Sequence, residues 1–419
     1  MVNGVNGDDK EVLKLLQEAC DREVDREELA GVALLVQQHG QERWYVESGK
    51  RSIERDEPMT RDTIFRLYSQ TKPITGVATM MLLERGLVDL AQPVSDFLPG
   101  FKNQRVSTEY KGFDEAQGAI EKSGFPTVDA NNEMTIKNLL TMTSGLPYPD
   151  PTCDAGRYAA QVFAEVDRRL HTDNPMGTVE LANRLGEGPL RFQPGTQWMY
   201  GTSADVLGAV VEVASGMRFG DFLRTQIFEP LGMNDTAFYV PERKLPRLAA
   251  VYDNPHDPME RVNADAPLHE IRTDHLGVEY VPLNDPAYQA GGAGLKSTLD
   301  DYARFGRMLL NDGEFNGERI MQPATARFMH EPTATPEGYW DKAHGQCYNN
   351  LVRVVEHPGM SDMLCHVGEY GWDGWLGTFF SNDPATDSTI LLMYQITNAG
   401  TTSFTRKVRN IVVSHLLVD

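Results

Sequence analysis

A serine and a lysine three residues apart, in Ser69-Gln70-Thr71-Lys72, have the types and spacing for covalent chemistry. On a helix, residues three apart lie on one face, with Cβ atoms roughly 5–6 Å apart. A serine hydroxyl becomes a good nucleophile beside a base, and a lysine removed from water can be that base. The orphan N–H groups and positive dipole of a helix N-terminus would favour a developing oxyanion beside the serine. The pattern therefore predicts nucleophilic catalysis by Ser69.

The neighbouring residues indicate the elements that position this pair. Residues 64–68 form a short apolar run, and apolar residues recur with helical spacing over 74–86. Pro73 fits a first helical turn, where an N–H has no intrahelical partner to lose. Ser69 is thus predicted at a strand-to-helix junction, in the first turn of the helix. A Ser-x-x-Lys pattern also arises by chance roughly once in a chain of this length, so a structural serine is the alternative.

Composition and charge bound the class of protein. The chain has 419 residues, of which 41% are hydrophobic and 24% charged, which is ordinary for a soluble globular protein. The net charge of -21 disfavours nucleic acids and anionic membranes as partners. There is no signal-peptide pattern, no apolar run of membrane-spanning length, and no paired spacing among Cys20, Cys153, Cys347 and Cys365. We therefore expect a cytoplasmic protein with free thiols.

Strand patterns lie at both ends of the chain and helical patterns in its middle. Short apolar or alternating runs predict strands over 31–38, 43–47, 351–355, 375–381 and 388–395. Helical spacing predicts helices over 11–20, 135–142, 158–166, 178–185, 204–214, 219–228 and 405–417. This order favours one domain, 1–419, in which a sheet split in sequence (1–66 plus 286–419) receives a mainly helical lobe (67–285).

Six segments together resemble the superfamily of serine β-lactamases and penicillin-binding proteins. They are FRLYSQTKPITGVATMMLLERGLVDLAQPVSDFLPGF, MTIKNLLTMTSGLPY, PGTQWMYGTSADVLGAVVEVASG, EPLGMNDTAF, GGAGLKSTLDDYARFGRMLLNDG and YGWDGWLGTFFSNDPATD. The similarity is greatest to the class C-like branch, which includes family VIII carboxylesterases, D-amino-acid-specific peptidases and fungal acyltransferases. It implies an α/β (α+β) fold, with an antiparallel sheet flanked by helices and an inserted helical lobe.

The resemblance assigns roles to the first two motifs. The first falls on Ser69 and Lys72, and it implies that Ser69 is the nucleophile that accepts the acyl group. The second has a tyrosine two residues before an asparagine or serine; it falls on Tyr200-Gly201-Thr202, where Thr202 replaces the usual residue. A desolvated Lys72 near Tyr200 would have a lowered pKa or hold the tyrosine as a phenolate. Either could take the serine proton, and Tyr200 is better placed to protonate the leaving alcohol.

The third motif, Lys-Thr-Gly in the lactamases, falls on Trp372-Asp373-Gly374. Esterase-like members carry tryptophan or histidine in place of the lysine, and its loss weakens the grip on a β-lactam carboxylate. The resemblance also implies an oxyanion hole made by the backbone N–H groups of Ser69 and Trp375. By their places in the motifs, we expect five residues to line the substrate pocket: Tyr148, Thr202, Trp372, Asp373 and Gly374. For Trp372 and Trp375, packing in the core is the alternative to lining the pocket.

These motifs favour a serine carboxylesterase that forms an acyl-enzyme with small esters or amides and needs no cofactor or metal. His269-Glu270, followed by His275, lacks the His-Glu-x-x-His spacing of a zinc site. The alternatives are a β-lactamase, a D-amino-acid peptidase or amidase, an acyltransferase, or a catalytically silent binding protein. The sequence defines neither the natural ester nor the oligomeric state.

Overall fold

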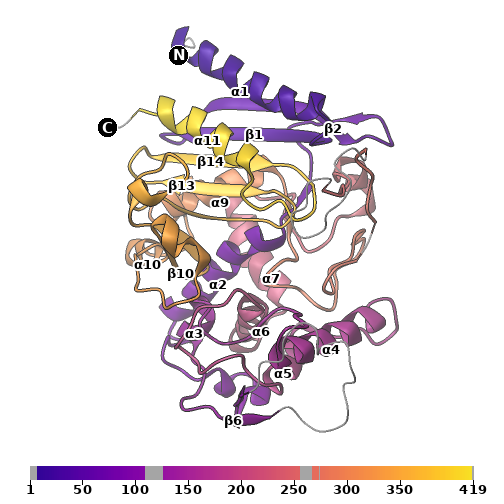
Figure 1. Ribbon diagram of the computed structural model, residues 1–419, viewed down its shortest axis with the longest axis vertical. Coiled ribbons are helices and arrows are strands. Elements are labelled where there is room, and N and C mark those ends of the chain that lie inside the picture. Colours follow the sequence, from indigo (N-terminus) through magenta and orange to yellow (C-terminus); the bar gives the residue numbers. More distant parts are fainter. Residues whose placement is uncertain (1–6, 109–125, 255–266, 273, 418–419) are drawn as a thin grey trace.

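The computed structural model describes residues 7–108, 126–254, 267–272 and 274–417, and its central feature is an antiparallel sheet (Figure 1). The sheet has eight strands in the order β10-β11-β12-β13-β14-β1-β2-β3. Strand β1 pairs with β14, so segments from the two ends of the chain meet inside the sheet. The strands are β1 (Gly31–Gln38), β2 (Gln41–Ser52), β3 (Glu57–Pro58), β10 (Gln346–Asn349), β11 (Val352–Val355), β12 (Tyr370–Asp373), β13 (Phe379–Asp383) and β14 (Ser388–Met393).

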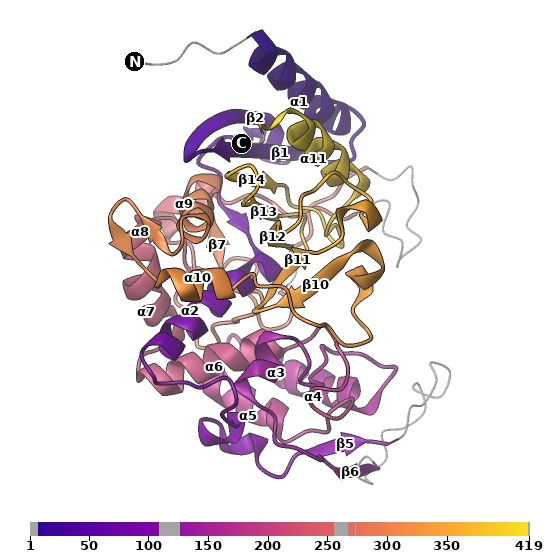
Figure 2. The ribbon, with the colours of Figure 1, turned by 90° about the vertical axis from the view of Figure 1, so that its left-hand side faces the viewer.

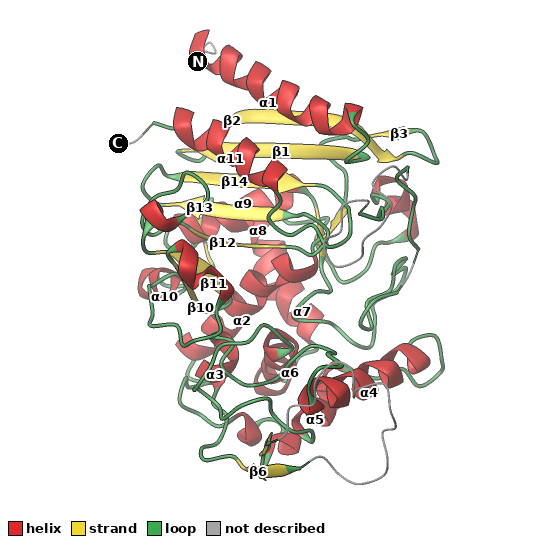
Figure 3. Cartoon of the chain, in the orientation of Figure 1, coloured by secondary structure: helices red, strands yellow, loops and turns green. Residues whose placement is uncertain are grey.

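Strand β1 explains how both faces of the sheet are covered. Val32, Leu34 and Val36 belong to one apolar cluster, whereas Ala33 and Leu35 belong to another, because successive side chains of a strand point to opposite faces. Helices α1 and α11 complete the first cluster, and α9 and α2 contribute to the second (Figure 3). These helices are α1 (Gly7–Asp25), α2 (Lys72–Glu84), α9 (Leu299–Leu310) and α11 (Ser403–His415). The predicted helix-flanked antiparallel sheet is confirmed.

Further helices gather on the side of the molecule away from α1, and Figure 2 shows them around α3, α5 and α6. Helix α2 lies between them and the sheet. It is buried from Lys72 to Leu82, because most of these residues are apolar and the helix is covered on all sides. The remaining helices are α3 (Ile136–Leu140), α4 (Asp154–Arg169), α5 (Thr178–Gly186), α6 (Ser203–Ser215), α7 (Phe219–Leu223), α8 (Glu229–Leu231) and α10 (Pro323–Phe328). Across the described ranges, no helix is both long enough and apolar enough to cross a bilayer.

Three pairs of short strands complete the fold, and one of them leads to Ser69. They are β4 (Phe65–Arg66) with β7 (Lys296–Ser297), β5 (Arg105–Ser107) with β6 (Thr127–Asp129), and β8 (Glu314–Phe315) with β9 (Glu318–Arg319). The β4–β7 pair joins the residues before Ser69 to the glycine-rich segment 291–294.

Two of the predicted elements take a different form in the structure. The strand predicted over 375–381 begins only at Phe379, because residues 374–378 form a tight turn in which the Gly374 N–H donates to the Thr378 carbonyl at 2.6 Å. The helix predicted over 219–228 is divided into α7 and a π-helical turn (Arg224–Phe228), and α8 follows directly after it. The polar, glycine-bearing segment 102–133 predicts an excursion from the core, and its residues 109–125 lie outside the described residues.

Candidate active site

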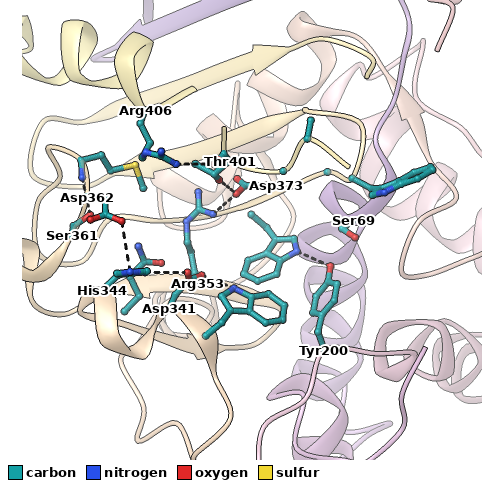
Figure 4. Close-up of a pocket in the computed structure, with 18 of the residues that line it drawn as sticks. Ser69, Tyr200, Asp341, His344, Arg353, Ser361, Asp362, Asp373, Thr401 and Arg406 are labelled. Carbon is teal, nitrogen blue, oxygen red and sulfur yellow. Dashed lines mark hydrogen bonds and ion pairs between the residues drawn. The ribbon is translucent and has the colours of Figure 1, made fainter. Parts of the chain in front are cut away.

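Ser69 lies where β4 turns into α2. It is part of a 3-10 turn, Tyr68–Thr71, and α2 follows at Lys72. Tyr68 has a φ of 45°, a left-handed backbone that costs a non-glycine residue energy and is common at functional sites. The junction is as predicted, although Ser69 precedes the helix rather than lying in its first turn. Ser69 lines the cleft in Figure 4.

Lys72 is fully buried and directly contacts Ser69. Its Nζ lies 3.0 Å from Ser69 Oγ, 3.1 Å from the Tyr148 hydroxyl and 2.8 Å from the Gly292 carbonyl oxygen. The three N–H bonds of an ammonium group match these three acceptors. A neutral amine fits the same positions if the Ser69 hydroxyl donates to its lone pair and its two N–H groups bind Tyr148 and Gly292. The arrangement therefore accommodates lysine on both sides of a proton transfer.

A buried carboxylate lies behind this lysine, and its role was not predicted. Asp205 accepts hydrogen bonds from the Tyr288 hydroxyl at 2.7 Å and from the Gly292 N–H at 3.0 Å. Burial raises the pKa of Asp205, while Lys72 and these donors oppose the rise. Gly292 donates its N–H to Asp205 and accepts a hydrogen bond from Lys72 at its carbonyl. The backbone of this one residue therefore links the carboxylate to the lysine.

Glycine is required in this segment because other groups approach its backbone closely. A Cβ on Gly291 would lie 2.3 Å from the Ala204 carbonyl oxygen, and one on Gly292 would lie 2.8 Å from Asp205 Oδ2. Glycine permits such close approach because it has no side chain. The paired glycines were the only signal in the sequence that could have indicated this contact.

Two tyrosines flank Lys72 in different ways. The ring of Tyr200 lies against the lysine, with its centroid 4.6 Å from Nζ, and its hydroxyl accepts a hydrogen bond from Trp372 Nε1 at 3.0 Å. The Tyr148 hydroxyl instead contacts Nζ directly. Burial, followed by the charge of Asp205, raises the pKa of Tyr148 well above its ordinary value, so this hydroxyl stays protonated at neutral pH. The Trp372 N–H would stabilise negative charge on Tyr200 oxygen.

The turn after β12 is fixed against the segment that carries Ser69. A Cβ on Gly374 would lie 2.3 Å from the Leu67 carbonyl oxygen, and the Thr378 hydroxyl donates to that same oxygen at 3.1 Å. Trp375 follows Gly374, and both Trp375 and Ser69 line the cleft. This docking brings together the two residues whose backbone N–H groups the sequence assigns to the oxyanion hole.

The side chain of Trp375 is held by partners that the sequence did not predict. Its indole Nε1 donates to Asn398, and its ring stacks on His275 with centroids 4.5 Å apart and an interplanar angle of 16°. Burial lowers the pKa of His275, so the ring is neutral at pH 7. His275 therefore supports the wall of the cleft. Among the described residues, no group of three or more His, Cys, Asp or Glu could hold a metal ion.

The cleft has a volume of about 560 Å³ and two chemically distinct parts (Figure 4). Near Ser69 it is lined by aromatic rings: Trp340 lies 5.3 Å from Tyr200 and 6.5 Å from Trp372, centroid to centroid. Farther from Ser69 it is lined by charged groups, including Asp341, Arg353, Asp373 and Arg406. The arrangement combines a candidate nucleophile with an apolar wall and a charged region.

Three of the five predicted pocket residues, Trp372, Asp373 and Gly374, line this cleft. Thr202 and Tyr148 are not among the residues that line it. Thr202 is fully buried, because it precedes α6 and its N–H donates to the Leu146 carbonyl at 3.2 Å. Tyr148 is half-buried, and its hydroxyl contacts Lys72 Nζ at 3.1 Å.

Comparison with known proteins adds independent information. A family model described as Beta-lactamase matches residues 16–412. Esterase EstB of Burkholderia gladioli is 28% identical over 388 residues, which cover 90% of this chain and 89% of EstB. A monacolin J acid methylbutanoyltransferase of Aspergillus terreus is 31% identical over 294 residues, covering 69% of this chain and 63% of that enzyme. The structure of EstCE1, a hydrolase with promiscuous acyltransferase activity, has a TM-score of 0.76 and 24% identity, covering 97% of this chain and 100% of EstCE1.

Proposed function

We propose, from the premise that this chain belongs to the β-lactamase family and is a serine hydrolase-type enzyme, that it hydrolyses small carboxylic esters through an acyl-enzyme. One observation carries the proposal: Nζ of the fully buried Lys72 lies 3.0 Å from Ser69 Oγ. A hydroxyl in contact with a buried amine is the arrangement that an acyl-accepting serine needs.

In the acylation step, Ser69 Oγ attacks the ester carbonyl carbon while its proton moves to Lys72 Nζ. The negative charge that develops on the carbonyl oxygen is stabilised by the N–H groups of Ser69 and Trp375. Each such donor is typically worth about 10²–10³ in rate. The lysine already has acceptors for its other two N–H groups, so taking the proton requires no rearrangement.

The alcohol leaves when its oxygen receives a proton, and Tyr200 is the proposed donor. Its hydroxyl accepts from Trp372 Nε1, which leaves the phenolic proton available and stabilises the phenolate that remains. Lys72 has by then taken the Ser69 proton, and its positive charge beside the Tyr200 ring also stabilises the phenolate. Water then attacks the carbonyl carbon of the acyl-enzyme and gives its proton to the Tyr200 phenolate. Lys72 returns its proton to Ser69 Oγ as the bond to the acyl group breaks, which regenerates Ser69.

The first alternative is transfer of the acyl group to an alcohol instead of water, as the name of the Aspergillus terreus relative describes for that protein. The aromatic wall of Tyr200, Trp340 and Trp372 could hold an acceptor alcohol. A β-lactamase or D-amino-acid amidase is less favoured, because Trp372 stands where the lactamase motif has lysine. We also propose a cytoplasmic location, since all four cysteines are free thiols.

The test combines labelling with turnover. Intact-mass spectrometry after treatment with a fluorophosphonate should show one adduct on the wild type and none on Ser69→Ala. The same variant should hydrolyse short-chain p-nitrophenyl esters about 10³-fold or more slowly than the wild type. Ser361→Ala is the matched control, because Ser361 lines the same cleft and should keep both properties. Labelling or turnover that survives in Ser69→Ala would contradict the proposal. Product that forms only with an added alcohol would indicate acyl transfer.

A further inference from the structure

The charged part of the cleft contains an ion pair that the proposed reaction does not use. Arg353 on β11 and Asp373 on β12 lie on neighbouring strands, and Arg353 Nη1 donates to Asp373 Oδ2 at 2.7 Å. The two side chains are only 7% and 16% exposed. The Thr401 hydroxyl donates to the same Oδ2 (Figure 4). The pair is therefore a fixed part of the cleft wall.

Arg353 carries a positive charge, and the adjacent carboxylate of Asp373 neutralises it; we call this masking. Burial acts to lower the pKa of the Arg353 guanidinium, but Asp373 and Asp341 outweigh it and raise the pKa above its ordinary value. Arg353 Nη2 and Asp373 Oδ1 are buried without a hydrogen-bond partner among the described residues. The pair is thus held by one direct contact, and Asp373 is the nearest negative charge to a guanidinium that cannot lose its proton.

The other charged groups of the cleft leave it slightly acidic. Asp341 and Asp362 face Arg353 and Arg406 around the same cavity. His344 lies between the first two, 3.7 Å from an Asp341 oxygen and 3.6 Å from an Asp362 oxygen. With Asp373 included, carboxylates outnumber guanidinium groups by one.

We propose that Asp373 determines substrate specificity by masking Arg353, so that the enzyme excludes esters that carry a carboxylate and accepts neutral or cationic ones. This inference rests on the proposed ester hydrolysis and adds the substrate class to it. A negatively charged substrate group in the cleft is repelled by the excess of carboxylates, and the partial exclusion of water strengthens this repulsion. We expect the repulsion to lower kcat/KM about ten-fold. The side chain acts through its charge, because its carboxylate is already held by Arg353 and Thr401.

The first measurement compares kcat/KM for a neutral and an anionic ester, with one matched pair for each side of the scissile bond. For the acyl side we use p-nitrophenyl hexanoate and mono-p-nitrophenyl glutarate; for the alcohol side, 4-nitrophenyl acetate and 3-carboxy-4-nitrophenyl acetate. Wild type should prefer the neutral member about ten-fold on at least one side. Asp373→Asn should reduce that preference about ten-fold, because it leaves Arg353 charged and unmasked.

Two further variants make the opposite changes. Arg353→Met should increase the preference for neutral esters, and it tests the proposal even if Asp373→Asn does not fold. The double variant Arg353→Met/Asp373→Asn should return to the wild-type preference. Asp362→Asn is the matched control, since it removes the same charge from a side chain that is 69% exposed. It should change the preference less than about two-fold, and high salt should abolish that change.

A second readout does not depend on catalysis. Of the five tryptophans, Trp340 and Trp375 are exposed or half-buried and line the cleft, whereas the other three are buried. Quenching of their fluorescence by iodide relative to neutral acrylamide should therefore report the charge of the cleft. The iodide-to-acrylamide ratio should rise in Asp373→Asn and fall back in the double variant.

The two readouts separate the possible failures. If neutral esters are turned over normally but the neutral-to-anionic preference is the same in wild type, Asp373→Asn and Arg353→Met, the masking proposal is wrong and the proposed function stands. If no ester is turned over while iodide quenching changes as expected, the proposed function fails and the masking of Arg353 is supported. Unchanged quenching in well-folded Asp373→Asn overturns the masking directly.

Discussion

Lys72 and Lys296 lie on either side of one glycine-rich segment, and both are almost fully buried, with exposures of 0% and 2%. Lys72 Nζ binds the Gly292 carbonyl and also two hydroxyls, those of Ser69 and Tyr148. Within the described part of the chain, the hydrogen bonds of Lys296 Nζ go to two carbonyls, those of Gly294 and Phe238. The two lysines are therefore similarly buried, and they differ in the groups that their Nζ atoms contact.

The charges around the two lysines differ as well. Lys72 lies near the buried carboxylate of Asp205, and the two interact electrostatically. Burial and the neighbouring guanidinium of Arg66 lower the pKa of Lys296 to about 7, with only partial opposition from Glu279. A lysine can thus have a strongly lowered pKa without any hydroxyl to activate. Contact with a nucleophile therefore identifies a candidate base better than a perturbed pKa does.

The largest expected effect comes from removing each lysine in turn. Lys72→Met should lower kcat/KM for p-nitrophenyl esters by about 10³–10⁴, because it removes the base beside Ser69. Lys296→Met should leave kcat/KM within about three-fold of wild type. Steady-state kinetics on both variants, with circular dichroism to confirm folding, measures this difference. Equal losses of activity in the two variants would mean that Lys72 acts only through structure.

The next effect separates the two tyrosines that flank Lys72. Tyr200→Phe should lower kcat by about 10²–10³, since the proposed proton donor to the leaving alcohol is lost. Tyr148→Phe should cost about ten-fold, because it removes one acceptor of the Lys72 N–H groups. Rates with esters of better leaving groups, which need less protonation, should recover in Tyr200→Phe alone. If the rate recovered in Tyr148→Phe instead, Tyr148 and not Tyr200 would be the proton donor to the leaving alcohol.

A smaller effect is expected from the glycines that present the two carbonyl groups. Gly292→Ala should lower activity about ten-fold, because its Cβ would lie 2.8 Å from Asp205 Oδ2 and displace the carbonyl that Lys72 binds. Gly294→Ala should mainly lower stability, by about 1–3 kcal/mol, because its Cβ would lie 2.7 Å from the Phe238 ring. Kinetics and denaturant unfolding are the measurements. Gly359→Ala, with open space around it, is the control.

The last effect concerns the pH dependence of stability and not activity. Because the pKa of Lys296 is lowered from 10.5 to about 7 on folding, the unfolded chain binds more protons between these values. The free energy of unfolding contributed by this residue therefore rises with pH from about 7 to about 10.5. The wild-type minus Lys296→Met difference, measured by denaturant unfolding across this range, should show that rise. A flat difference would mean that Lys296 remains protonated in the folded protein.

The parts of the site that could be predicted from sequence are those whose residues are neighbours on one element or match a family motif. Ser69 and Lys72 are three residues apart, so local geometry alone brings them together. Asp205, Gly292 and Tyr148 meet Lys72 only through the packing of α6 and the glycine-rich segment, which no spacing in the chain encodes. For the same reason the contact between the Tyr148 hydroxyl and Lys72 was not predicted.

The fold shows the same division. Strand β1 and helix α2 were predictable because their apolar patterns are strong, and both are almost completely buried. The turn at 374–378 was predicted as strand, because its apolar residues resemble one and nothing local indicates that the backbone must bend to meet Leu67. Arg353 was not predicted either, since its partner Asp373 is on the neighbouring strand and an arginine in a buried strand gives no sign of a cleft.

The pairing of β1 with β14 has a consequence for synthesis on the ribosome. Ala33 can pair with Met393, its register partner, only after nearly the whole chain has emerged. During translation β1 therefore has an unpaired edge, and contacts so distant in sequence form slowly. The strand that precedes Ser69 and the turn that carries Trp375 also come from opposite halves of the chain. A nascent chain interrupted before β14 should remain inactive and prone to aggregation, so activity would begin only when the last strand is released.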